Sequence, residues 1–169
     1  GSFVGSVCEG LLPLESATFD AISAIFSVNT LGPSMLATAA LPHLKATRGS
    51  IVNVSSTFGH KAAALLSHYA ASKAALEHLT RCWALELASA GVRVNAVAAG
   101  PTETDFLSER MRLSESDIEA IKAQERARIP LGRRGEPADV ANWIVSLASP
   151  QAAWMTGQVI TVDGGLDAT

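Results

Sequence analysis

The feature that most constrains the fold is an alternation of short β-branched runs with long helical segments. The β-branched runs are Ser50–Ser55, Val92–Ala98 and Val159–Val162, and each has the length and composition of a buried strand. Residues 67–90 are rich in Ala and Leu at helical spacing, and Gly91 follows as a stop signal. Strands joined through helices favour right-handed crossovers and a parallel sheet. We therefore expect an α/β fold with helices flanking a parallel sheet.

Three further segments are predicted to be helical. Residues 15–47 have a helical pattern with a break near Gly32 and Pro33, and residues 103–128 form a charged, interrupted helix. Glu136 and Pro137 open a helix with proline in its first turn, and Pro150 ends it.

The first strand poses a problem of pairing. Ile51–Val54 would form a bare, apolar sheet edge, which favours aggregation. The only other candidate strand is Phe3–Val7, at the start of the chain. Either an upstream segment or a partner is therefore expected to cover this edge.

Composition excludes several classes of protein. The chain has 169 residues, 48% hydrophobic and 17% charged, so we expect one globular domain over residues 1–169. A net charge of −3 argues against nucleic acid or an anionic membrane as the main partner. Cys8 and Cys82 form no disulfide pattern, no signal peptide opens the chain, and apolar runs such as Trp143–Leu147 are too short for a bilayer. These features predict a cytoplasmic protein.

The strongest chemical signal is Tyr69-Ala-Ala-Ser-Lys73. Positions i and i+4 share one face of a helix, and a lysine ammonium near a phenol favours the phenolate. Such a tyrosine is suited to general acid–base catalysis near neutral pH. A surface Tyr and Lys on an ordinary helix is the alternative.

Two other residues strengthen the first interpretation. Ser56 follows the first strand, where its hydroxyl could bond a substrate oxygen that Tyr69 protonates; a turn or capping role is the alternative, and for Ser55 that role suffices. Asn29 precedes Pro33 by four residues, and because proline has no N–H, the Asn29 carbonyl loses its helical partner and could hold a water. A proline kink used only for packing is the alternative there.

These residues resemble the short-chain dehydrogenase/reductase family. The resemblance covers nearly the whole chain, in the family's order and spacing. It rests on five segments: Phe26–Leu36, Ile51–Ser56, Tyr69–Lys73, Val92–Thr104 and Met155–Gly165. It implies a partial Rossmann-like doubly wound parallel sheet, the C-terminal half of that fold.

The resemblance also implies a function, hydride transfer between NAD or NADP and a small-molecule carbonyl or alcohol. By it, Tyr69 is the general acid/base, Ser56 polarises the carbonyl, and Lys73 lowers the phenol pKa and holds the nicotinamide ribose. Asn29 carries the water of a proton relay. The remaining implied cofactor contacts are Gly100, Pro101, Thr102 and Thr104. Residues 103–135 resemble a substrate flap, and the helices at 17–47 and 67–90 resemble those that form dimers or tetramers.

The sequence departs from the family's pattern at two places. No strand, glycine-rich turn and helix precede the catalytic motifs, and Gly1-Ser-Phe-Val-Gly5 is rejected as that fingerprint because no strand precedes it. Ala99 stands where the family usually has proline. A truncated homologue that binds no dinucleotide, serving as an oligomerisation partner or in non-redox acid–base chemistry, is therefore the rival hypothesis.

The histidines and the arginines of the flap are weaker candidates for functional residues. The histidines lack metal-ligand spacing, so no metal site is expected. The arginines of the flap could meet an anionic group, but a solvated face is the preferred interpretation for all four: Arg126, Arg128, Arg133 and Arg134.

Overall fold

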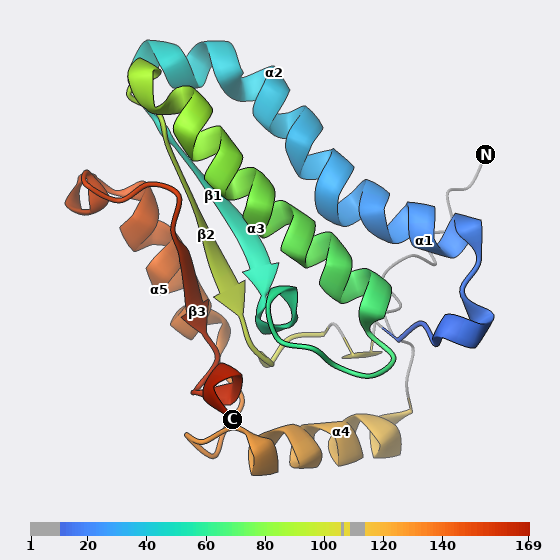
Figure 1. Ribbon diagram of the computed structural model, residues 1–169. Coiled ribbons are helices and arrows are strands. Elements are labelled where there is room, and N and C mark those ends of the chain that lie inside the picture. The colour runs from blue at the N-terminus through green and yellow to red at the C-terminus, as the bar shows by residue number, and fades with distance from the viewer. Residues whose placement is uncertain (1–10, 106, 109–113) are drawn as a thin grey trace.

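The computed structural model describes residues 11–105, 107–108 and 114–169. Within them, three strands alternate with five α-helices (Figure 1). The strands are β1 (Ser50–Ser56), β2 (Arg93–Ala99) and β3 (Val159–Val162). The α-helices are α1 (Phe19–Phe26), α2 (Gly32–Thr47), α3 (Ser67–Leu87), α4 (Glu115–Arg128) and α5 (Pro137–Ala148). Short 3-10 turns include η3 (Thr57–Gly59) and η4 (Ala88–Ala90), and η2 (Ser27–Leu31) is a π-helical turn.

The sheet is parallel, in the order β1-β2-β3. Ser50 pairs with Arg93 and Ser56 with Ala99, while β3 joins β2 through the pairing of Ala96 with Val159. The prediction of an α/β fold with a parallel sheet is confirmed, and each strand lies within one residue of its predicted bounds.

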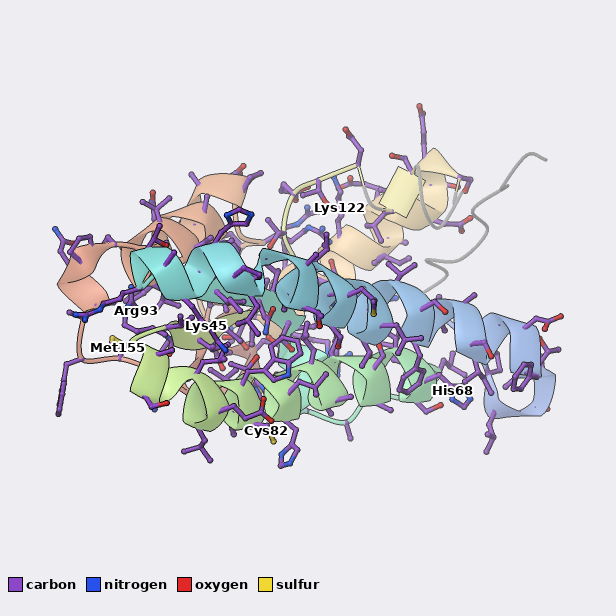
Figure 2. The ribbon with its side chains drawn as sticks, turned by 90° about the horizontal axis from the view of Figure 1, so that it is seen from above. Lys45, His68, Cys82, Arg93, Lys122 and Met155 are labelled. Atoms are coloured by element: carbon purple, nitrogen blue, oxygen red, sulfur yellow. The ribbon has the colours of Figure 1, made fainter. Side chains whose placement is uncertain are left out.

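Helices cover both faces of this sheet, which gives three layers. Side chains alternate across a strand, so Ile51 packs into a core with α3, whereas Val52 packs into a second core with α5. The first core is centred on Ala84 and Val94 and the second on Val97. Both views show α2 beside α3 (Figures 1 and 2). Near-continuous apolar burial is typical of parallel strands, and Val94 and Val97 are fully buried.

The helical region near Pro33 differs from the prediction. Instead of breaking at Gly32 and Pro33, the helix continues from Phe19 to Thr47 through the π-helical turn η2. The Gly32 N–H donates to the Ser27 carbonyl, five residues earlier, which is the hydrogen bond of a π-helix. This wider turn lets the helix continue although Pro33 has no N–H to donate. Helix initiation also comes later than residue 15, at Phe19, where Thr18 caps the first turn through the Ala21 N–H.

This helix also changes the expectation about membrane spans. Phe19–Thr47 is long and apolar enough to cross a bilayer by length and composition, so the expectation that every apolar stretch is too short was wrong. Such a helix near the start of a chain is weak evidence for a membrane, because a core helix of a soluble protein can pass the same test.

Local signals set the ends of the other helices. Gly91, at φ 74°, terminates η4 in the left-handed conformation after α3. Pro137 occupies the first turn of α5, and Glu136 and Asp139 form a reciprocal capping box there. The Arg93 guanidinium donates to the carbonyls that end α5, at 2.8 to 3.3 Å, in the region where Figure 2 labels Arg93 and Met155.

The predicted bare edge is present in the part of the chain that the structure describes. There β1 pairs only with β2, and Val54 on it is 44% exposed. The candidate strand Phe3–Val7 lies outside the described residues. Of the helix predicted over 103–128, residues 115–128 form α4, residues 103–104 are bends, residue 105 is a turn and residues 107–108 are π-helical, while 106 and 109–113 lie outside the described residues.

Candidate active site

The carboxyl ends of β1 and β2 bring the predicted residues to one end of the sheet. Ser56 is the last residue of β1, and Gly100 follows directly after β2. The arrowheads of both strands point toward the end of the molecule where α4 lies (Figure 1). In open parallel sheets, binding sites form outside this edge.

Tyr69 and Lys73 lie on the first two turns of α3. The Lys73 Nζ is 5.8 Å from the centroid of the Tyr69 ring, as the i, i+4 spacing predicts. Lys73 also donates a 3.0 Å hydrogen bond to the carbonyl of Val54, on the strand that carries Ser56. The lysine therefore links the tyrosine to the end of β1.

Asn29 is fixed against the same turn of α3. Its Nδ2 donates to the Ser72 Oγ at 3.1 Å, and the hydroxyl of Thr30 donates to the Ser72 carbonyl at 3.2 Å. Ser72 is fully buried, and its own hydroxyl donates to the Tyr69 carbonyl at 2.7 Å. The π-helical turn η2 thus packs against Ser72, which lies between Tyr69 and Lys73 in the sequence, and this contact brings Asn29 to the predicted site.

The two serines at the end of β1 have different environments. The Ser56 Oγ accepts the Phe58 N–H at 3.3 Å and so caps η3, which leaves the hydroxyl hydrogen able to donate elsewhere. The Ser55 Oγ donates to the Glu77 Oε1 at 2.8 Å and lies 3.4 Å from the Lys73 carbonyl. Ser55 therefore has a structural role, whereas Ser56 combines a cap with an available donor.

Glu77 is a buried carboxylate that sequence reasoning missed. It is 2% exposed and lies one further turn along the helix face of Tyr69 and Lys73. Its Oε1 is 3.1 Å from the His60 Nδ1, and the His60 Nε2 lies 3.4 Å from the Asp167 Oδ2. The i, i+4, i+8 spacing of Tyr69, Lys73 and Glu77 was the signal that could have found it.

The loop after β2 is held by backbone bonds to its neighbours. The Gly100 N–H donates to the Val162 carbonyl at 3.0 Å, and the Thr102 hydroxyl donates to the Gly100 carbonyl at 3.0 Å. Pro101 accepts the Gly135 N–H at 2.9 Å, and Thr104 closes the loop in a bend. The four predicted cofactor contacts of this loop therefore lie at the carboxyl edge of the sheet.

Asp163 organises the same edge from β3. Its Oδ2 accepts the hydroxyl of Thr57, a fully buried residue, at 3.0 Å, and its Oδ1 accepts the Gly165 N–H at 2.9 Å. This carboxylate ties η3, next to Ser56, to the turn that leaves β3.

The flap arginines do not all form a solvated face. Arg126 pairs with Glu119 at 2.8 Å and Arg133 with Asp139 at 2.7 Å, both at the surface. Arg134 is instead 5% exposed, so the expectation of a solvated side chain was wrong for it. The signal was weak, because two adjacent arginines give no sign of which one points inward.

The donor set fits the nicotinamide half of a dinucleotide. A phenol and an ammonium share one helix face, and an ammonium carries three donors, so it can serve a carbonyl and a ligand hydroxyl together. Among the described residues, no group of three or more His, Cys, Asp or Glu is arranged to hold a metal ion.

Comparison with known proteins identifies the family. The Enoyl-(Acyl carrier protein) reductase family matches residues 8–167 of the chain. The chain belongs to the short-chain dehydrogenase/reductase family. It is 42% identical, over 85% of its length, to the 3-oxoacyl-[acyl-carrier-protein] reductase FabG of Thermotoga maritima.

Solved structures of this family have the same fold. A short-chain dehydrogenase/reductase of Caenorhabditis elegans with cofactor superposes with a TM-score of 0.86 at 30% identity, over 95% of this chain and 62% of that one. A gluconate 5-dehydrogenase from Burkholderia cenocepacia J2315, in complex with NADP and tartrate, gives a TM-score of 0.84 at 29% identity over 94% and 61%.

The similarity covers nearly all of this chain but only part of each related protein. The chain spans 56% of the Thermotoga reductase's length and 61 to 62% of these two structures. The partial Rossmann-like sheet predicted from the sequence is confirmed by these similarities, as is membership of the family.

Proposed function

We propose that the protein transfers a hydride between NAD(P)(H) and a carbonyl or alcohol substrate, as a 3-oxoacyl reductase or a sugar or alcohol dehydrogenase does. The observation that carries the proposal is the Tyr69–Lys73 pair on α3, with Ser56 at the end of the strand whose Val54 carbonyl accepts from Lys73. The reductase and dehydrogenase names of the relatives support it.

In the reducing direction, the proposed roles divide as follows. The Tyr69 hydroxyl donates its proton to the substrate oxygen, while the Ser56 hydroxyl donates a hydrogen bond to the same oxygen and polarises the carbonyl. The Lys73 ammonium stabilises the phenolate left on Tyr69. Asn29, docked on Ser72, carries the water through which that phenolate regains a proton.

The cofactor would be held at the carboxyl edge of the sheet. NAD or NADP supplies or accepts the hydride when bound. Tyr69 and Lys73 would contact its nicotinamide ribose, and the loop of Gly100, Pro101, Thr102 and Thr104 would face the nicotinamide and pyrophosphate.

The wider organisation is proposed from the same observations. Residues 1–169 would form a single domain in which residues 103–135 act as a substrate flap, since α4 lies beyond the strand ends (Figure 1). A homo-oligomer, a dimer or tetramer, is supported by apolar side chains exposed on α1, η2 and α2: Phe19, Val28, Leu31, Met35 and Leu36. The net charge of −3 favours neither nucleic acid nor an anionic membrane as partner, and the cysteine spacing favours the cytoplasm.

The test is Tyr69→Phe, measured by NAD(P)H oxidation with a panel of ketones and by circular dichroism. The variant should fold normally and lose roughly 10²- to 10⁴-fold in turnover, because only the proton donor is removed. Unchanged turnover would refute the proposed role.

Neighbouring serines provide a matched pair for the same assay. Ser56→Ala should reduce kcat strongly and cost about 1 kcal/mol in stability through the lost cap of η3. Ser55→Ala should reduce stability with little effect on kcat, because the Glu77 carboxylate loses a buried donor. Equal effects of the two substitutions on kcat would contradict the assignment of Ser56.

A further inference from the structure

An ionic cluster around one buried arginine joins α4 to the loop that follows β2. We call it the Arg134 cluster, and its members are Arg134, Glu103, Glu125, Lys122 and the carbonyl of Thr102. The Arg134 side chain is only 4% exposed. Its charged guanidinium is therefore removed from water, which is costly unless protein groups replace the lost hydration.

The guanidinium of Arg134 hydrogen-bonds two acceptors and lies within ion-pair distance of a third group. One terminal nitrogen donates to the Thr102 carbonyl at 2.6 Å, and the other pairs with the Glu125 carboxylate on α4. The Nε lies 3.1 Å from the Glu103 Oε1, within ion-pair distance, but it makes no hydrogen bond to the described residues. The planar guanidinium reaches these three groups in different directions, whereas the ammonium of a lysine is a single point charge.

Lys122 completes the cluster from α4. Its Nζ is 2.7 Å from the second oxygen of Glu103, and Figure 2 labels this lysine. Glu103 thus lies between Arg134 and Lys122, and the pKa of its carboxyl is held below its ordinary value, chiefly by the hydrogen bond from Lys122. With two carboxylates and two cations, the cluster is neutral, so it offers little net charge to an anionic substrate.

Backbone pairing makes the same loop responsive to Arg134. The Glu103 N–H donates to the Gly135 carbonyl at 2.8 Å and the Gly135 N–H donates to Pro101 at 2.9 Å, so the loop pairs with the residue next to Arg134. A change at the guanidinium therefore reaches the loop through both its side chain and its backbone.

We propose that Arg134 is a positioning residue that locks α4 and the loop Gly100–Thr104 in one arrangement and thereby sets the affinity for the nicotinamide cofactor. The structural half of this inference stands on the contacts alone. Its link to affinity rests on the proposed function, in which that loop faces the cofactor.

Hydrogen–deuterium exchange of Arg134→Met tests the structural half, with Arg133→Met as the matched control. Peptides covering residues 101–105 and 115–128 should exchange on the order of tenfold faster or more in Arg134→Met, because the contacts that join the two segments lose their shared guanidinium. Peptides from β1 and α3 should be unchanged. Arg133→Met should match the wild type, since its pair with Asp139 is at the surface. Wild-type exchange of both segments in Arg134→Met would overturn the proposal.

Titration of NADH and NADPH into the same variants tests the link to affinity. Arg134→Met should bind roughly tenfold more weakly than the wild type, Arg134→Lys should lie between them, and Arg133→Met should be unchanged. Faster exchange with unaltered affinity would refute the link. Absence of binding by the wild type would instead count against the proposed function and leave the exchange result standing.

A second variant covers the case in which Arg134→Met fails to fold. Glu125→Ala removes only the contact on α4, so peptides of 115–128 should exchange faster while 101–105 stays protected by its contacts with Arg134 and Gly135. Wild-type exchange of 115–128 in Glu125→Ala would overturn the proposal.

Discussion

Replacing Glu77 by alanine should destabilise the protein far more than its place on a helix suggests. The carboxylate is buried between α3 and the η3 turn, where it accepts from Ser55 and lies 3.1 Å from His60. Alanine would leave the buried Ser55 hydroxyl and the His60 ring nitrogen without this acceptor, behind the turn that Ser56 caps.

The magnitude follows from the groups left unpaired. A buried polar group that loses its partner costs about 1 to 3 kcal/mol, and hydrogen bonds to charged groups contribute about 1.5 to 3 kcal/mol. Relief of the desolvated carboxylate offsets part of this loss, so we expect a net loss of about 3 kcal/mol in the free energy of unfolding. For a chain of this size, that corresponds to a decrease in Tm of roughly 6 to 12 °C.

Urea unfolding followed by tryptophan fluorescence measures the loss, and the same helix offers a control. Glu86 is exposed on α3, so Glu86→Ala should change stability by less than about 0.5 kcal/mol. Glu77→Gln should lie between, because an amide can still accept from Ser55 and donate to His60. If Glu77→Ala and Glu86→Ala unfold at the same urea concentration, the carboxylate does not tie α3 to η3 and the reasoning fails.

Two further predictions concern the loop beyond β2. A Cβ added at Gly100 would lie 2.7 Å from the Asp163 Cα, so Gly100→Ala should lower Tm and weaken NAD(P)H binding. At Gly135 the nearest atom to an added Cβ is 3.6 Å away, so Gly135→Ala should change neither property. Equal Tm values for the two variants would show that Gly100 is not crowded by Asp163. The folded-state pKa of Glu103 lies below its ordinary 4.5, so its contribution to stability is fully present above that pH and is lost as the pH falls through the lower folded value. Glu103→Gln should therefore be less stable at neutral pH, and its free energy of unfolding, measured by urea titration, should change less with pH below 4.5. If that free energy falls with decreasing pH as steeply as in the wild type, the result would count against the ion pair of Glu103 with Lys122.

The strands and the catalytic candidates could be predicted because local chemistry specifies them. Buried parallel strands read as β-branched runs, and the Tyr69–Lys73 spacing places both residues on one helix face without help from distant contacts. Ser56 was located by the end of a strand, which a short apolar run marks well.

The supporting contacts could not be predicted in the same way, because they depend on tertiary packing. Asn29 was singled out for its carbonyl, yet the structure also docks its side chain on Ser72, a contact between residues far apart in the chain. Burial of Arg134 instead of its neighbour depends on where α4 presents Glu125, which no local pattern specifies. The helix continues past Pro33 because a π-helical turn accommodates a residue that has no N–H to donate, and helix propensity alone does not reveal such a turn.

A titration of NADH and NADPH into this 169-residue protein, followed by nicotinamide fluorescence, tests the proposed function most directly when Lys73→Met and the exposed control Lys45→Met are titrated alongside. We expect saturable binding of at least one cofactor by the wild type and Lys45→Met, with marked weakening in Lys73→Met. Absence of binding at millimolar cofactor, or equal binding by Lys73→Met, would contradict the proposed function and favour a homologue that uses this site without a dinucleotide.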